Sequence, residues 1–332
     1  MISQLQLLKV ELSFTVLNGI FLVQLPICLN MPEAIALQAT CQHLWQKKPT
    51  RIVLDLSRTI FIDSSGIGVL VSILKTATEQ GIELVFWSVH PQVRAALFLA
   101  GLDPFLMIDS ETKAITPADT HQLKHQLPTY HPSVRSRVKR LIDIIGALIG
   151  LGITAILFIP IAIAIKIDSS GPILFSQNRC GLLGKHFSLW KFRSMIENAE
   201  ELKELVENQV EGPFFKNKTD PRITGVGQFL RQTSLDELPQ FWNVLKGEMS
   251  LVGTRPPTLE EVDKYTFHMW QRLDVKPGIT GEWQTNGRST ISNFDQVIQL
   301  DLRYQKNWSI LYDFKLILKT LVTLLGNKNG GV

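Results

Sequence analysis

One stretch of this 332-residue chain limits its fold more than any other, because the residues from Ile144 to Ile165 include no charged side chain. A run of about 20 apolar residues can cross a lipid bilayer as a helix, and a helix buried inside a soluble domain is rarely so uniformly apolar. Pro160 lies inside the run and predicts a kink. Basic residues flank the run on both sides, so the positive-inside bias selects no orientation. The sequence therefore predicts a helix inserted in a membrane. A re-entrant helix, which enters and leaves by one face, would explain the symmetric charge.

Charge is unevenly distributed along the chain. Residues 1–110 hold 7 Lys and Arg against 8 Asp and Glu, whereas the remainder holds 27 against 22. A net basic second part suits an anionic membrane surface or phosphate-bearing substrates. The basic residues form no long run interleaved with aromatic residues, so nucleic acid is not an expected partner. The three cysteines match no zinc or redox pattern, and no basic segment followed by an apolar one begins the chain, so we expect no cleaved signal peptide.

Residues 1–110 show the alternation of strands and helices that is typical of a small α/β domain. Asn18-Gly19 between two alternating runs is a strong hairpin signal. Further along, the periodicity predicts helices over 31–46, 66–78 and 91–101, and strands over 51–56, 84–89 and 105–108.

Within this part, the segment FIDSSGIG (61–68) falls where a strand gives way to a helix. Together with LDLS (54–57) it resembles the STAS domain, the fold of anti-sigma factor antagonists and of the cytoplasmic ends of sulfate transporters. The resemblance covers residues 8–110 and implies a phosphorylation site at Ser64, with Ser65 as the second choice. A helix N-terminus accommodates a phosphate well, but Asp63 or Ser64 could equally serve only as the helix cap. Residues 111–134 lack any period and are predicted to be a linker.

An adjacent acidic pair, Asp236 and Glu237, stands out in the second part of the chain. Two neighbouring carboxylates repel each other, so such a pair is useful where a divalent cation or a reacting phosphate offsets the repulsion. The same residues also fit a capping box, with Ser234 as N-cap and Glu237 at the third helical position. The two interpretations are compatible, because a helix N-terminus favours an ionised Asp.

Cationic residues and short glycine turns surround this acidic pair, which is the composition that a site for a diphosphate and its metal needs. In order, the motifs are KFRSM (191–195), DPRIT (220–224), SLDELPQFWNVLKGEMSLVGTRP (234–256), VKPGITGEWQ (275–284), NGRS (286–289) and LDLRYQKNWSILYDFKLILKT (300–320). With Lys139, Arg140 and Asp143, they resemble the bacterial sugar transferases, the monotopic phosphoglycosyl transferases. The match runs from about residue 139 to 325. Ser194 and Thr254 depart from the family pattern in ways that keep the turn and the cations. Ile159 stands where the family often has a serine before the proline of the membrane helix, so the predicted kink depends on Pro160 alone.

The resemblance implies a role for each matching residue. Asp236 would be the nucleophile that attacks the β-phosphate of a UDP-sugar and releases UMP, and Glu237 would bind Mg²⁺. A carboxylate is a competent covalent nucleophile, and a metal lowers the repulsion between anions. The expected phosphate-binding residues are Lys191, Arg193 and Arg255, and Arg288 is a candidate for contact with the nucleotide.

The resemblance also implies partners and a location. The chain would start assembly of exopolysaccharide, capsule or O-antigen by moving a hexose 1-phosphate from a UDP-sugar to a polyprenyl phosphate at the bacterial inner membrane. Both substrates would place residues 1–110 and the catalytic domain over 169–326 on the cytoplasmic face. The membrane segment 135–168 would then hold a re-entrant helix. Residues 310–325 would form either an amphipathic helix at the membrane interface or a core helix. A regulatory protein or kinase would be a partner for the STAS-like part, and a homo-oligomer is left open. The alternative is an inactive transferase-like scaffold or signalling protein.

Overall fold

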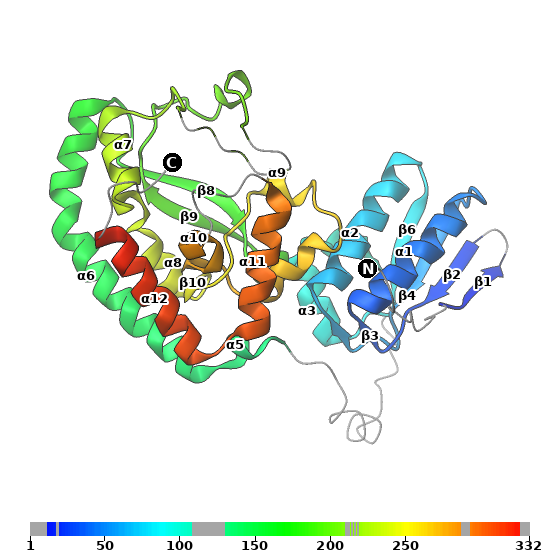
Figure 1. Cartoon of the computed structure of the whole chain (residues 1–332). Coiled ribbons are helices and arrows are strands. Elements are labelled where there is room, and N and C mark those ends of the chain that lie inside the picture. Colours follow the sequence, from blue (N-terminus) through cyan, green and yellow to red (C-terminus); the bar gives the residue numbers. More distant parts are fainter. Residues whose placement is uncertain are drawn as a thin grey trace, which may run out of the picture. The chain divides into compact units, whose positions relative to one another are not determined.

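The computed structural model describes residues 12–17, 20–107, 130–209, 213, 215, 217, 219–286 and 293–325, and Figure 1 shows the whole chain. The chain divides into two compact units. Unit 1 consists of residues 1–130 with the short segments 183–185 and 265–274, and unit 2 consists of residues 131–182, 186–264 and 275–332. Two segments from the later part of the sequence therefore belong to unit 1.

Unit 1 is an α/β domain built on a five-stranded sheet of order β1-β2-β4-β6-β7. β1 and β2 are antiparallel, and the other neighbours are parallel. A second, two-stranded sheet pairs β3 with β5. The elements are β1 (Phe14–Leu17), β2 (Ile20–Gln24), β3 (Cys28–Leu29), α1 (Met31–Trp45), β4 (Arg51–Asp55), β5 (Phe61–Ile62), α2 (Ser64–Glu79), β6 (Glu83–Trp87), α3 (Pro91–Leu99), η1 (Asp103–Phe105) and β7 (Leu106–Met107).

These elements agree with the predicted strands and helices to within about two residues at most ends. The antiparallel pairing of β1 with β2 fits the predicted hairpin, although its turn residues, Asn18 and Gly19, lie outside the described residues. Most of the predicted linker, 111–129, also lies outside them. The N-terminal α/β fold is thus confirmed.

Unit 2 is mainly helical, with one antiparallel hairpin, β8–β9, and one short parallel pair, β10–β11. Its elements are α5 (Pro132–Arg135), α6 (Arg137–Asp168), β8 (Leu174–Cys180), β9 (His186–Phe192), η3 (Lys203–Leu205), α7 (Gly225–Gln232), η4 (Leu235–Glu237), α8 (Gln240–Lys246), β10 (Ser250–Val252), α9 (Leu259–Val262), β11 (Gly278–Thr280), α10 (Glu282–Asn286), α11 (Phe294–Asn307) and α12 (Ile310–Leu325). The Glu- and Lys-rich stretch 196–207, whose charges fall at helical spacing, does not form an α-helix but turns and the 3₁₀ turn η3.

The helix α6 contains the whole uncharged stretch and continues through Pro160. By length and composition, it is the single helix of the described chain that could cross a membrane. Figure 1 shows it bending as it runs along unit 2. One face of α6 is buried from Lys139 to Ile165. The other face carries exposed apolar side chains along its length: Val138, Leu141, Ile145, Leu148, Ile149, Ile153, Ile156, Ile159, Ile163 and Ile167.

Candidate active site

The acidic pair lies on a short 3₁₀ turn, η4, between α7 and α8. Asp236 is 5% exposed. Ser234 adopts the left-handed conformation, with φ of 57°, and its side chain caps nothing. The predicted capping box was therefore wrong. Pro239 is the residue from which α8 begins, as expected for a proline that cannot occupy a helix interior.

The helix α6 positions this turn by packing closely on α8. A Cβ atom at Gly150 would stand 2.4 Å from Cγ of Phe241, so only glycine allows this approach. Four residues along α6, the Thr154 hydroxyl donates to the Gly150 carbonyl of its own helix at 2.7 Å and lies 3.3 Å from the Leu238 carbonyl. At the other end of α8, the Arg140 guanidinium donates to the carbonyls of residues 244 and 245 at 2.7 and 2.6 Å. The start and the end of α8 thus both contact the apolar helix.

The hairpin β8–β9 brings a cation to the acidic turn. Asn243 of α8 is fully buried and fixes the hairpin: its Oδ1 accepts from the Trp190 backbone N–H at 3.2 Å, and its Nδ2 donates to the Ser188 carbonyl at 2.8 Å. The next residue of β9 is Lys191. Asn243, which the sequence reasoning did not single out, therefore sets the position of Lys191 relative to the helix that follows the acidic turn.

Lys191 and the two carboxylates form one cluster. The Lys191 Nζ lies 2.9 Å from Oε1 of Glu237 and 3.9 Å from Oδ2 of Asp236. The side chain of Asp236 is 7% exposed, whereas those of Glu237 and Lys191 are 23% and 28% exposed. The cluster thus combines a buried carboxylate, a more accessible carboxylate and an accessible ammonium group, which is an arrangement able to receive a phosphate.

Arg231 also belongs to this cluster, although the sequence reasoning gave it no role. Its Nε donates to the Ser194 hydroxyl at 2.9 Å. Burial lowers the pKa of its guanidinium, while the nearby Asp236 carboxylate raises it. The position of Arg231 in the last turn of α7, just before the acidic turn, was the signal that could have identified it.

The structure gives Arg193 partners other than those predicted. It is 5% exposed, and its guanidinium donates to the carbonyls of Ser169 and Ser170 and, at 3.0 Å, to the Ser169 hydroxyl. Ser169 is the C-cap of α6. In this conformation Arg193 holds the end of the apolar helix, and its role as a phosphate ligand stays a prediction.

Arg255 lies in a second cationic group, in which it forms a two-pronged ion pair with Glu261 at 2.7 and 3.1 Å. Arg179 lies close by. Burial, followed by the charge of Arg255, lowers the pKa of the Arg179 guanidinium to about 10, whereas the carboxylates of Glu261 and Glu237 act to raise it. The guanidinium groups of Arg179 and Arg255 therefore lie near one another, and the charge of Glu237 in the acidic turn acts on Arg179. The remaining predicted residue, Arg288, lies outside the described residues.

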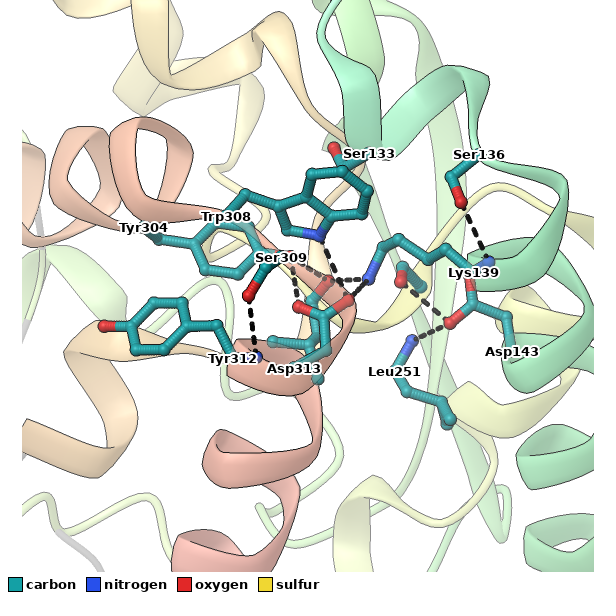
Figure 2. A network of polar contacts seen from close by, with 12 residues as sticks. Ser133, Ser136, Lys139, Asp143, Leu251, Tyr304, Trp308, Ser309, Tyr312 and Asp313 are labelled. Atoms are coloured by element: carbon teal, nitrogen blue, oxygen red, sulfur yellow. Dashed lines mark hydrogen bonds and ion pairs between the residues drawn. The ribbon is translucent and has the colours of Figure 1, made fainter.

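A buried polar network ties the start of α6 to α12 and β10 (Figure 2). The Lys139 Nζ lies 2.6 Å from Oδ2 of Asp313 and donates to the Val252 carbonyl at 3.0 Å. The Tyr304 hydroxyl donates to Asp313 at 2.9 Å. One turn further along α6, Asp143 accepts from the Ser250 hydroxyl at 2.8 Å and from the Leu251 N–H at 2.9 Å. Lys139 and Asp143 thus both fix β10, the strand that precedes Arg255.

Ser64 and Ser65 open α2 in unit 1, and both are fully buried. Asp63 is the helix cap, because its carboxylate accepts from the Gly66 N–H at 2.8 Å. The capping interpretation therefore holds for Asp63. Phosphorylation of either serine stays a prediction.

A model of the bacterial sugar transferase family matches residues 134–327, and a model of the STAS domain matches residues 11–114. The galactosyl transferase CpsE of Streptococcus agalactiae is 55% identical over 194 residues, which are 57% of this chain and 42% of that protein. The UDP-glucose:undecaprenyl-phosphate glucose-1-phosphate transferase of Escherichia coli is 39% identical over 204 residues, which are 59% of this chain and 42% of that protein. The chain spans about two fifths of the length of these relatives.

Among solved structures, the anti-sigma factor antagonist SpoIIAA in its unphosphorylated form is 19% identical, with a TM-score of 0.28, and covers 36% of this chain and 100% of its own. The family model covers more than half of the sequence and includes every residue of the acidic cluster. The chain therefore belongs to the bacterial sugar transferase family and carries a STAS domain ahead of the transferase region.

Proposed function

We propose that this chain transfers a sugar 1-phosphate, in the simplest case a hexose 1-phosphate, from a UDP-sugar to a polyprenyl phosphate such as undecaprenyl phosphate. The observation that carries the proposal is the cluster of Asp236, Glu237 and Lys191, with ammonium-to-carboxylate distances of 3.9 and 2.9 Å. The names of the relatives support it, because one is a glucose-1-phosphate transferase that acts on undecaprenyl phosphate. The product would start an exopolysaccharide, capsule or O-antigen.

The chemistry proceeds in two displacements at one phosphorus atom. A carboxylate oxygen of Asp236 attacks the β-phosphorus of the UDP-sugar, the bond to the bridging oxygen breaks, and UMP leaves with that electron pair. The resulting acyl phosphate carries the sugar. A phosphate oxygen of the lipid then attacks the same phosphorus, and the carboxylate of Asp236 leaves unchanged. Lys191 offsets negative charge near the phosphorus in both steps.

The acidic turn fits Mg²⁺, which proteins commonly hold through one or two carboxylates together with substrate phosphate oxygens. Among the described residues, no group of three or more His, Cys, Asp or Glu side chains could enclose a metal, so a substrate phosphate would complete the coordination. Glu237, the more exposed of the pair, would hold the ion. When bound, Mg²⁺ would neutralise diphosphate oxygens.

One face of α6 would lie in lipid at the cytoplasmic side of the inner membrane. The support is its one-sided burial, because elements of unit 2 that carry charged residues, such as α7 with Arg231 and α8 with Lys246, pack on the buried face of α6. A helix that crossed the bilayer would draw these elements into the hydrocarbon region, where charged groups cost several kcal/mol, about 2.5 to 3.5 each at the helix centre. A re-entrant or in-plane helix avoids this cost. Cysteines introduced near positions 135 and 170 should both be protected from, or both open to, an impermeant label in intact cells. Opposite accessibility would contradict this placement.

Activity is tested with the purified full-length chain, undecaprenyl phosphate, Mg²⁺ and a panel of UDP-sugars, with UMP release as the readout. At least one UDP-sugar should release UMP, and a β-phosphorus label should appear on the protein when the lipid is omitted. Asp236→Asn should abolish both signals. The matched control is Asp295→Asn, at an exposed carboxylate in the first turn of α11, which should keep both. Full UMP release by Asp236→Asn would sink the covalent mechanism, and no release with any sugar would favour the scaffold alternative.

A further inference from the structure

Residues 265–274 come from the part of the chain that the sugar transferase model matches, yet they belong to unit 1. The segment ends in the 3₁₀ helix η5 (Met269–Asp274). Three of its side chains are buried, since Trp270 is 4% exposed, Leu273 is 1% exposed and Arg272 is fully buried. Burial of this extent is typical of a segment seated on a surface that fits it.

The surface that receives Trp270 is shaped by two glycines. A Cβ atom at Gly68, in the second turn of α2, would stand 2.5 Å from Cγ of the indole. A Cβ atom at Gly184, in the other short segment of unit 1, would stand 2.9 Å from its Cζ3. Real Cβ atoms do not approach this closely, because atomic repulsion forbids it. The absence of both side chains therefore makes the space that the indole fills.

A second contact joins the segment to the first turn of the same helix. The Asp274 carboxylate accepts a hydrogen bond from the Ser64 backbone N–H at 3.0 Å. Asp63 already occupies the Gly66 N–H at 2.8 Å. The N-terminal N–H groups of a helix attract anions through their free donors and the helix dipole. Asp274 thus occupies the N-terminus of α2, where another anion could otherwise bind.

Two carboxyl groups, those of Asp63 and Asp274, already lie at this turn. Burial, followed by the charge of Asp274, raises the pKa of the Asp63 carboxyl to about 7. Ser64 and Ser65 are fully buried, and their hydroxyl oxygens have no hydrogen-bond partner among the described residues. The hydroxyls therefore do not hold the contact together. A negative charge on either serine would therefore be buried and would lie close to the carboxyl groups of Asp63 and Asp274.

We propose that the α2 face of the STAS domain is the docking site for residues 265–274 of the same chain, and that a negative charge at Ser64, such as a phosphate, releases this segment. Docking needs Ser64 uncharged, because the charged group would compete with Asp274 for the same N–H donors and repel its carboxylate. Release is connected to unit 2 by the chain itself. Val275 packs with Val252 in a core of unit 2, and β11 pairs with β10.

The test is hydrogen–deuterium exchange of the full-length chain, read on peptides that cover 265–274. Ser64→Glu supplies the charge, and Ser64→Gln is the matched control of nearly equal size without it. We expect exchange over 265–274 to be about tenfold or more faster in Ser64→Glu than in Ser64→Gln. Adding Asp274→Asn to Ser64→Glu should reduce this difference, since it removes one of the repelling charges and keeps an acceptor for the Ser64 N–H.

Strand β4 (Arg51–Asp55) serves as the internal check that unit 1 remains folded. Equal exchange over 265–274 in Ser64→Glu and Ser64→Gln, with β4 still protected, would overturn the release by charge. If Ser64→Glu also unfolds β4, the variant Trp270→Ala tests whether residues 265–274 dock on α2. This variant should increase exchange both over 265–274 and in the first turns of α2. Wild-type protection in both places would overturn the proposal.

Discussion

The close contact between α6 and α8 leads to a prediction with a built-in control. Gly150→Ala and Gly152→Ala add the same methyl group two residues apart on one helix. The Cβ atom would stand 2.4 Å from Cγ of Phe241 at position 150, but at position 152 it would meet nothing within 4 Å. The pair therefore separates the effect of the contact from the effect of the helix.

The expected magnitudes follow from these distances. Either substitution should gain about 1 kcal/mol, because alanine favours a helix over glycine by roughly that amount. Overpacking offsets this gain only at position 150, by about 1 to 3 kcal/mol. Gly150→Ala should therefore be about 1 to 3 kcal/mol less stable than Gly152→Ala. Phe241 must also move by about 1 Å to restore ordinary contact, and a shift of that size near a catalytic turn can lower a rate by roughly 100-fold.

The two variants are compared by urea unfolding in detergent and by UMP release. Gly152→Ala should match or exceed the wild type in the free energy of unfolding and keep its activity. Equal stability and equal activity in the two variants would refute the reasoning. It would mean that the Phe241 ring turns aside without moving α8, and that α6 does not set the position of the acidic turn.

Three further predictions concern charged groups. The pKa of Asp63 is raised to about 7 from a model-peptide value of 3.8, so the folded chain keeps a proton there that the unfolded chain loses. The free energy of unfolding should therefore fall as pH rises from about 4 to 7. Asp63→Asn should flatten this slope in thermal unfolding, and an unchanged slope would contradict the reasoning. Lys139→Met should lower the free energy of unfolding in urea by about 3 to 5 kcal/mol, because it leaves the buried Asp313 without its cation. The double variant Lys139→Met with Asp313→Leu should recover most of this loss. Additive losses would show that the pair is not coupled. Lys191→Met should lower kcat/KM for UMP release by about 100-fold or more, and a change within about threefold would remove this residue from the mechanism.

Local signals account for the success of prediction in unit 1. Strand alternation, the hairpin dipeptide and the helix cap at Asp63 each depend on residues that are neighbours in sequence, and the observed ends of α2 and β4 follow them closely. Ser234 shows where such signals fail. Its spacing to Glu237 fits a capping box, but the connection from α7 to α8 requires a left-handed residue there, and that requirement is tertiary.

The cations around the acidic pair show the same limit. The sequence analysis expected Lys191, Arg193 and Arg255 near the pair but could not show the hydrogen-bond or ion-pair partners of each side chain. On a strand, successive side chains point to opposite faces, and Lys191 was expected to bind phosphate because of the family resemblance, with no prediction of its contact with Glu237. Arg193, just past the end of β9, meets the carbonyls at the end of α6 instead. Arg231 was missed because an arginine in the last turn of a helix is usually explained by the helix dipole.

The one-sided burial of α6 connects the two halves of the proposed reaction. A polyprenyl phosphate keeps its chain in lipid and its charged head at the surface, so its acceptor oxygen can reach the enzyme only close to an apolar surface. The exposed face of α6 is such a surface along its whole length. The opposite face contacts the residues that follow the acidic pair, because Gly150 packs on the Phe241 ring and the Thr154 hydroxyl lies 3.3 Å from the Leu238 carbonyl. Only the thickness of one helix, about 10 Å with its side chains, therefore separates the proposed lipid face from the turn that carries Asp236. The same helix that would dock the chain on the membrane would also set the position of the proposed nucleophile.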